Sequence, residues 1–193
     1  MRQTWNEKLQ VYTWEMTDQL RKPLYIKRYK NLLNSRKLRE LAEKYSYRII
    51  FIPHPLMYPY IAKFKVPSYI ETLSFEEVCL RKVFAESNIM VTDYSSVAFD
   101  FAYLKKPVLY YQFDRDSFFT NHTYKRGYFS YERDGFGEII DNEAELLSVM
   151  EQYLKSECHM KDMYGERVDR FFDMGKGSCS ERLFTRVKFE AEV

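Results

Sequence analysis

Two serines stand where a short apolar segment gives way to a helical pattern. Residues 88–91 have the composition of a buried strand, a three-residue turn begins at Thr92, and Ser95 and Ser96 open the helix. Ligands of open parallel sheets bind at the carboxyl ends of the strands. The first amides of a helix have no intrahelical acceptor, so these amides and the hydroxyls of Thr92, Ser95 and Ser96 can bind a phosphate. The same spacing also fits an ordinary N-cap at Ser95.

A histidine follows a second predicted strand, over residues 49–52. Its neighbours Pro53 and Pro55 fix the backbone and stop the strand, which places His54 at the carboxyl edge of the sheet, facing the same cleft as Ser95. An imidazole at this position can donate a hydrogen bond to a phosphate or transfer a proton near neutral pH. The alternative is an ordinary polar residue in a turn.

Basic residues gather in a loop over residues 122–128, which contains His122, Lys125 and Arg126. Lysine and arginine bind diphosphates, and arginine does so with two parallel hydrogen bonds. A solvated charged loop would have the same composition. Two later glycines, Gly135 and Gly137, indicate turns only.

Short apolar strands alternate with amphipathic helices along the chain. The patterns predict strands over 49–52, 69–73, 88–91 and 107–113, and helices over 24–33, 35–45, 74–86, 95–104, 142–154, 160–172 and 180–190. A long aromatic loop over 114–137 interrupts the alternation, and loops of about 20 residues are usually functional. The alternation is typical of a doubly wound α/β fold, a Rossmann-like parallel sheet with helices on both faces. We expect one domain over residues 1–193.

The composition is that of a globular protein and excludes several functions. The chain has 193 residues, 46% of them hydrophobic, and a net charge of +2 without any basic block, so we expect no nucleic-acid partner. Its 3 cysteines are widely separated and form neither a zinc motif nor a disulfide framework. The apolar runs are far shorter than the ~20 residues of a membrane span, and the first residues do not form a signal peptide. These features favour a cytoplasmic location.

Three segments together resemble one protein family. They are VTDYSSVAFDFAYLKKPVLYYQFD, the upstream IIFIPHP and the downstream HTYKRGYFSYERDGFGEII. This combination resembles the CDP-glycerol:poly(glycerophosphate) glycerophosphotransferase family, whose members build teichoic-acid and capsule polymers. The likeness is strongest over Arg48–Ile140, and FFDMGKGSCSERLF is similar to the closing helix of the family. It implies that this chain is the C-terminal, donor-binding half of a GT-B fold.

The resemblance also implies a reaction and its residues. Family members transfer glycerol phosphate or ribitol phosphate: an acceptor hydroxyl attacks the β-phosphorus of a CDP-linked donor, and CMP leaves. Such transfer needs in-line positioning and charge stabilisation more than covalent chemistry. His54 matches the catalytic histidine of the family at the donor phosphates. The matching donor-binding positions are Thr92, Asp93, Ser95, Ser96 and Asp100, with Lys125 or Arg126 and His122 from the basic loop. No residue is assigned to a metal, and a need for Mg²⁺ stays open.

The family pattern includes parts that this sequence lacks. The donor domain of the family usually begins with an apolar strand that ends in a PTWR-like motif. Here Gln3–Asn6 stands in that place, with Asn6 where the arginine would be, and no apolar strand precedes it. The first strand of a Rossmann order lies in the middle of the sheet, so we expect a sheet that lacks its first strand. The N-terminal half of the family, which holds the acceptor and a further catalytic histidine, is an expected partner, and any attachment to the inner face of the membrane would come from such other parts.

Two other functions remain open from the sequence. The first is a GT-B glycosyltransferase that uses a nucleotide sugar, because the same phosphate site would hold any nucleoside diphosphate. The second is a non-catalytic module that binds a nucleotide or a partner protein. Its partner-binding surface would be aromatic and would consist of Tyr110, Tyr111, Phe113, Phe118 and Phe119. The alternative, which we favour, is that these rings pack in the interior or meet the N-terminal half.

Overall fold

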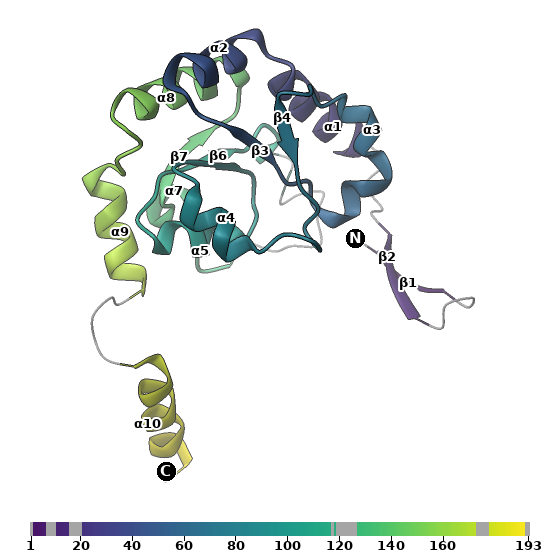
Figure 1. Cartoon of the computed structure of the whole chain (residues 1–193). Coiled ribbons are helices and arrows are strands. Elements are labelled where there is room, and N and C mark those ends of the chain that lie inside the picture. Colours follow the sequence, from purple (N-terminus) through teal and green to yellow (C-terminus); the bar gives the residue numbers. More distant parts are fainter. Residues whose placement is uncertain are drawn as a thin grey trace.

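The computed structural model of the chain describes residues 2–6, 11–15, 21–116, 118, 127–172 and 178–191. Helices lie on both faces of a group of short parallel strands (Figure 1). An antiparallel hairpin of β1 (Arg2–Asn6) and β2 (Val11–Glu15) precedes this body. The sequence patterns did not indicate that hairpin, and they placed the expected PTWR-like motif where β1 lies.

The first part of the body contains one parallel strand pair. β3 (Ile49–Phe51) lies beside β4 (Ile70–Thr72), with Ile49 opposite Ile70. The helices of this part are α1 (Arg21–Leu33), α2 (Arg36–Tyr45), the 3₁₀ helix η1 (Pro55–Tyr60) and α3 (Ile61–Phe64). The strands and the first two helices agree with the sequence predictions.

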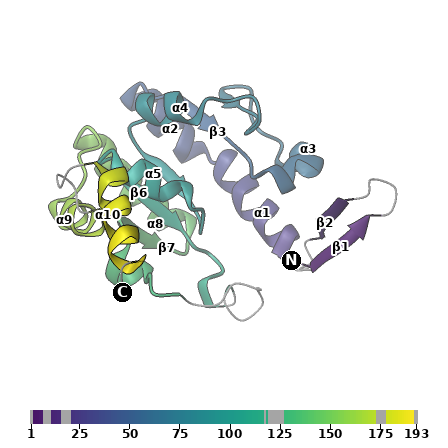
Figure 2. The same ribbon diagram turned by 90° about the horizontal axis from the view of Figure 1, so that it is seen from below.

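The second part is a parallel sheet of three strands. Its order is β5-β6-β7, for β5 (Met90–Thr92), β6 (Val108–Tyr111) and β7 (Gly137–Ile140). The accompanying helices are α4 (Leu80–Glu86), α5 (Val97–Tyr103), α7 (Tyr131–Asp134), α8 (Glu143–Lys155), α9 (Asp162–Phe172) and α10 (Cys179–Ala191). Figure 2 shows β6 and β7 on one side of the molecule and β3 with α1 on the other.

The central strand β6 is buried on both faces. Leu109 and Tyr111 belong to a core cluster with residues of α1, α2 and α8, whereas Val108 and Tyr110 belong to a second cluster with residues of α4, α5 and α9. A strand that helices cover on both faces needs an uninterrupted apolar run. The α/β fold class predicted from the sequence is therefore confirmed.

The aromatic surface of the partner-binding alternative is not exposed. Tyr110 is 1% exposed, Tyr111 is 0% exposed and Phe118 is 7% exposed. Phe113 packs against Tyr111, with their ring centroids 5.1 Å apart. Phe119 lies outside the described residues. The described rings fill the core, which agrees with the internal packing that the sequence analysis favoured over an exposed surface.

Helix α4 begins later than the sequence pattern indicates. The predicted helix started after Ser74, but α4 starts at Leu80. The Ser74 hydroxyl accepts a hydrogen bond from the Glu76 amide, 3.4 Å away, and the Phe75 amide donates to the hydroxyl of Tyr58. These bonds hold the chain after Ser74 in turns, because Ser side chains compete with helical hydrogen bonding.

Gly137 is a strand residue and not the turn residue that the sequence indicated. It begins β7, and a Cβ atom built on it would lie 1.6 Å from the carbonyl oxygen of Val108 in β6. Only glycine allows this close approach of two backbones. The sequence predicted a single loop over 114–137. The end of this stretch instead forms helix α7 and the start of the edge strand β7. The four-residue strand was missed because it is short and begins with a glycine.

We expect Gly137→Ala to lower the free energy of unfolding by about 1–3 kcal/mol or more, because β7 must move away from β6. Urea denaturation followed by circular dichroism measures the change. Gly165→Ala in α9 is the matched control, since a Cβ there meets nothing within 4 Å. That control should be neutral or stabilising, as alanine favours a helix. Equal stability of Gly137→Ala and the wild type would contradict this explanation of β7.

The parallel strands form two separate sheets around one shared core. In the part of the chain that the structure describes, β3 pairs with β4 and β5 pairs with β6, but no strand joins β3 to β5. Nevertheless Phe51 and Ile70 share a cluster with Leu109, Tyr111 and Ile140. The break lies in the middle of the strand order, where the expected first strand of a Rossmann sheet would lie.

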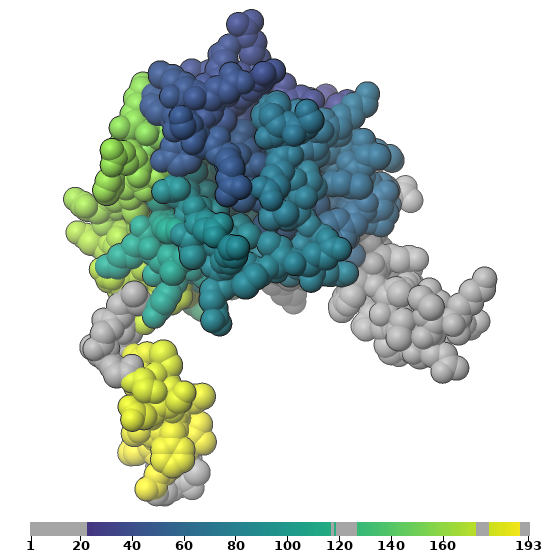
Figure 3. All heavy atoms as spheres, in the orientation of Figure 1, coloured from purple at the N-terminus to yellow at the C-terminus, as the bar shows by residue number. Residues whose placement is uncertain are grey.

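The last helix, α10, carries exposed apolar side chains. Figure 3 shows it standing apart from the rest of the molecule. Its large apolar residues are between 58% and 70% exposed, namely Leu183, Phe184, Val187 and Phe189. Apolar side chains grouped on a surface are typical of an interface.

Candidate functional site

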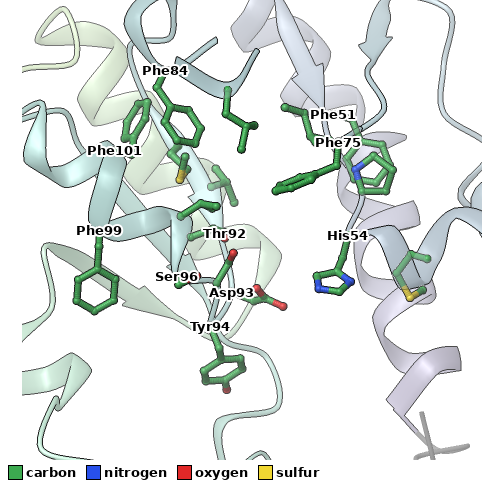
Figure 4. Close-up of a pocket in the computed structure, with 18 of the residues that line it drawn as sticks. Phe51, His54, Phe75, Phe84, Thr92, Asp93, Tyr94, Ser96, Phe99 and Phe101 are labelled. Atoms are coloured by element: carbon green, nitrogen blue, oxygen red, sulfur yellow. The ribbon is translucent and has the colours of Figure 1, made fainter. Parts of the chain in front are cut away.

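A cavity of about 760 Å³ lies between β3 and β5. Its mouth is lined by the residues that follow the two strands: His54 after β3, and the turn over 92–96 after β5. In Figure 4, His54 and Asp93 face each other across the opening. The structure thus brings His54 to the same cavity as Thr92, Ser95 and Ser96, although β3 and β5 belong to separate sheets that share one core.

The backbone around His54 orients its ring. His54 is the N-cap of η1, and its Nδ1 accepts a hydrogen bond from the Leu56 amide, 3.2 Å away. Its carbonyl oxygen accepts from the Met57 amide at 2.7 Å. An imidazole that accepts at Nδ1 carries its proton on Nε2 when neutral. His54 therefore offers a hydrogen-bond donor at Nε2 to whatever occupies the mouth.

The turn over 92–96, called the serine turn below, does not use the Ser96 hydroxyl to cap α5. Ser96, and not Ser95, is the N-cap of α5, and its side chain makes no capping hydrogen bond. The ordinary N-cap reading of Ser95 was therefore wrong. The Ala98 amide donates to the Ser95 carbonyl and the Phe99 amide to the Ser96 carbonyl, which tightens the start of the helix. Since α5 has only 7 residues, the hydroxyls matter more for an anion here than the dipole of the helix.

Residues after β6 hold this turn in place. The buried Gln112 donates from Nε2 to the carbonyl oxygen of Asp93 at 3.3 Å. The Tyr94 hydroxyl donates to Oδ1 of Asp114 at 3.2 Å, and the Tyr94 ring stacks on Phe118 with centroids 3.5 Å apart. Sequence reasoning missed Gln112 and Asp114 as site residues. Their place directly after a buried strand is the signal that could have found them.

The Tyr131 hydroxyl near the turn stays protonated at neutral pH. Burial and, to a smaller extent, the nearby Asp93 carboxylate together raise the pKa of Tyr131 to about 12. Tyr131 lines the cavity together with Tyr94 and Phe129. At neutral pH the Tyr131 hydroxyl therefore acts as a hydrogen-bond partner and not as a base.

The described residues at the end of the basic loop line this cavity. Gly127, Tyr128 and Phe129 line it. The predicted donor-binding residues His122, Lys125 and Arg126 lie outside the described residues, so the structure does not test their positions. The described residues of the lining contain one imidazole and one carboxylate, those of His54 and Asp93, and no Lys or Arg.

The structure does not bring Asp100 into the site. Asp100 is exposed on α5 and does not line the cavity. It lies in the first turn of α5, where a carboxylate stabilises the helix. Its proposed role came only from the resemblance to the family, and its position here favours a role in the helix.

Two further features bear on function. Within the described ranges, no three His, Cys, Asp or Glu side chains are grouped so that they could hold a metal ion. None of the described helices combines the length and the apolar character needed to cross a bilayer.

Comparison with known proteins identifies the class. The α/β fold resembles that of the wall teichoic acid polymerase TagF, with a TM-score of 0.53 and 19% identity over 92% of this chain and 50% of the TagF chain. A TagF variant structure after a 15-minute soak with CDPG also has a TM-score of 0.53, at 22% identity, and covers 82% of this chain and 42% of that one. The fold is thus GT-B-like.

The sequence then assigns the family. The model of the CDP-glycerol:poly(glycerophosphate) glycerophosphotransferase family matches residues 11–188, so the chain belongs to this family. The minor teichoic acid biosynthesis protein GgaB of Bacillus subtilis is 37% identical over 163 residues, which cover 84% of this chain and 17% of GgaB. The teichoic acid poly(glycerol phosphate) polymerase of the same organism is 29% identical over 113 residues, 58% of this chain and 15% of that protein. The chain therefore spans less than a fifth of these two relatives.

Proposed function

We propose that this chain is the donor-binding part of a transferase for polyol phosphates. The donor is CDP-glycerol or a related CDP-polyol, the acceptor is a hydroxyl of a teichoic-acid-like or capsular polymer, and CMP is released. The observation that carries the proposal is the juxtaposition of His54 with Ser95 and Ser96 at the mouth of one cavity, in a member of the glycerophosphotransferase family.

The diphosphate of the donor lies at the mouth. Hydroxyls of Thr92, Ser95 and Ser96 and the backbone amides of the turn donate hydrogen bonds to its oxygens, and charge-assisted bonds of this kind are strong. Lys125 and Arg126 directly precede Gly127, which lines the cavity, and this supports their role as the cations of the site.

His54 stabilises the charge that develops during transfer. The acceptor oxygen forms a bond to the β-phosphorus in line with the leaving CMP oxygen, which keeps the electron pair of the broken bond. Because Nδ1 of His54 already accepts from the Leu56 amide, its Nε2–H donates to a phosphate oxygen. The proton of the acceptor hydroxyl goes to a base in the acceptor-binding half.

That acceptor-binding half is the main protein partner in the proposal. Residues 1–193 act as one domain for the donor, and an N-terminal GT-B half binds the acceptor polymer. The exposed apolar side chains of α10 and the small share of GgaB that the chain covers support such a partner. A cytoplasmic location stays a prediction, which fractionation of producing cells tests.

Nucleotide titration tests the choice of donor. We expect the chain to bind CDP more tightly than UDP or GDP in isothermal titration calorimetry, because the family uses CDP-activated donors. Tight UDP binding without a preference for CDP would contradict the proposal and favour a glycosyltransferase that uses a nucleotide sugar, since the phosphate site alone does not select the base.

A further inference from the structure

Tyr128 is an exposed aromatic residue in the wall of the candidate site. It is 83% exposed, and among the large apolar and aromatic residues that the structure describes none is more exposed. It lines the cavity between Gly127 and Phe129. An aromatic ring in water is stabilised when it packs on a flat surface such as a nucleobase. The ring of Tyr128 is therefore available to a ligand in the cavity.

Aromatic contacts hold the segment that carries Tyr128 beside the serine turn. Tyr131 of α7 packs edge-on against Tyr94 of the serine turn, with ring centroids 5.8 Å apart. Phe129 packs on Phe99 of α5, the helix that follows the serine turn, with centroids 4.9 Å apart. Tyr128 directly precedes Phe129 in the chain. Its backbone therefore lies next to the place where the proposed function puts the diphosphate.

Arg133 of α7 fixes the backbone at Tyr128. Its Nη2 donates to the Tyr128 carbonyl oxygen at 2.5 Å and to Oδ2 of Asp134 at 2.7 Å, while its Nε donates to Oδ1 of Asp134 at 2.9 Å. Oδ2 of Asp134 also accepts from the Ser130 amide at 2.9 Å. The hydrogen bonds from Arg133 and Ser130 lower the pKa of Asp134 to about 2, so this ion pair persists at neutral pH. A guanidinium can make these bonds together because its donors form a planar fork.

Helix α7 is fixed to the rest of the molecule by contacts that do not involve Arg133. The Gly135 carbonyl oxygen accepts from Nη1 of Arg167 in α9 at 2.8 Å, and the Tyr131 ring packs on Tyr110 of β6 with centroids 5.0 Å apart. The side chain of Arg133 is 67% exposed, and exposed ion pairs contribute little to stability. The bond from Arg133 to the cavity wall therefore favours a role in ligand binding over a role in the stability of the fold.

We infer that Tyr128 stacks on the nucleobase of the bound donor and that Arg133 is the positioning residue that holds Tyr128 there. The inference rests on the proposed function, because it needs a nucleotide in the cavity. Tyr128 contacts the ligand with its ring. Arg133 does not line the cavity and acts only through the Tyr128 backbone. Stacking does not depend on the hydrogen-bonding groups of the base, so Tyr128 contributes to affinity and not to the choice between CDP and UDP.

Calorimetric titration of the full chain with CDP and UDP tests both roles. Tyr128→Ala should raise Kd by roughly fivefold or more for both nucleotides, whereas Tyr128→Phe keeps the ring and should bind as the wild type does. Arg133→Ala should also raise Kd, by about twofold or more, because the backbone at Tyr128 loses its anchor. The matched control is Arg36→Ala, since Arg36 forms a similarly exposed ion pair with Glu40 at 2.7 Å on α2, away from the cavity. The control should leave Kd unchanged.

A double variant separates positioning from a general effect on the fold. In the Tyr128→Ala background, Arg133→Ala should cause no further loss of CDP affinity, because Arg133 acts through the residue that has already been removed. Additive losses in the double variant, or an unchanged Kd in either single variant, would overturn the inference while the proposed function stands. A wild-type chain that binds no CDP would overturn the proposed function as well, so the two failures are distinguishable.

Discussion

His54→Ala should lower kcat by roughly 10²–10³-fold in a transferase that joins these residues to their acceptor-binding half. This is the usual cost of removing one donor to the charge that develops in a transition state. The affinity for CDP should change much less, because in the proposal Ser95 and Ser96 bind the diphosphate in the ground state. Turnover of CDP-glycerol with a defined acceptor, measured as CMP release, gives kcat and KM separately.

Two variants sharpen this result. His54→Gln keeps an N–H donor close to the place of Nε2, so it should recover part of kcat if His54 donates a hydrogen bond. If His54 instead accepted the proton of the acceptor hydroxyl, the glutamine would recover nothing. His159→Ala is the matched control, because His159 is exposed and does not line the cavity. Full turnover by His54→Ala would contradict the role assigned to His54.

The double variant Ser95→Ala and Ser96→Ala should weaken CDP binding by about 1–3 kcal/mol, or roughly 5–150-fold in Kd, through lost hydrogen bonds to a charged ligand. The fold should persist, because the Ser96 side chain makes no capping bond to α5. Calorimetry measures Kd, and thermal melting checks the fold.

The control for the double variant is Ser87→Ala. Ser87 lines the same cavity but lies before β5, at the end away from the mouth. Its loss should leave Kd unchanged. A double variant that binds CDP as well as the Ser87→Ala protein would mean that the phosphates do not lie on the serine turn.

The strand ends that carry the candidate site could be predicted from local sequence patterns. A β-branched run that stops at Pro53 and a strand that gives way to Ser95 each mark a strand end, and a single parallel sheet would bring such ends to one edge. In the structure β3 and β5 belong to separate sheets, so the meeting of His54 with the serines also depends on the core that the two sheets share. Among the described strands, the break between β3 and β5 lies at the place that the first strand takes in a Rossmann order.

Other features depend on contacts between distant residues. Gly137 fits beside Val108 only because two backbones meet there, and its neighbours Phe136 and Glu138 in the sequence do not indicate that contact. The late start of α4 depends on a hydrogen bond from the Phe75 amide to Tyr58, 17 residues earlier. The hydrogen bond from Gln112 to the Asp93 carbonyl likewise joins two neighbouring strand ends. Periodicity reports burial along one element and carries no information on such pairs.

The most direct measurement is a crystal structure of this chain with bound CDP. The proposal predicts diphosphate oxygens within about 2.7–3.2 Å of His54 Nε2 and of the hydroxyl of Ser95 or Ser96. CDP bound elsewhere on the molecule, with neither His54 nor the serine turn touching its phosphates, would contradict the proposal.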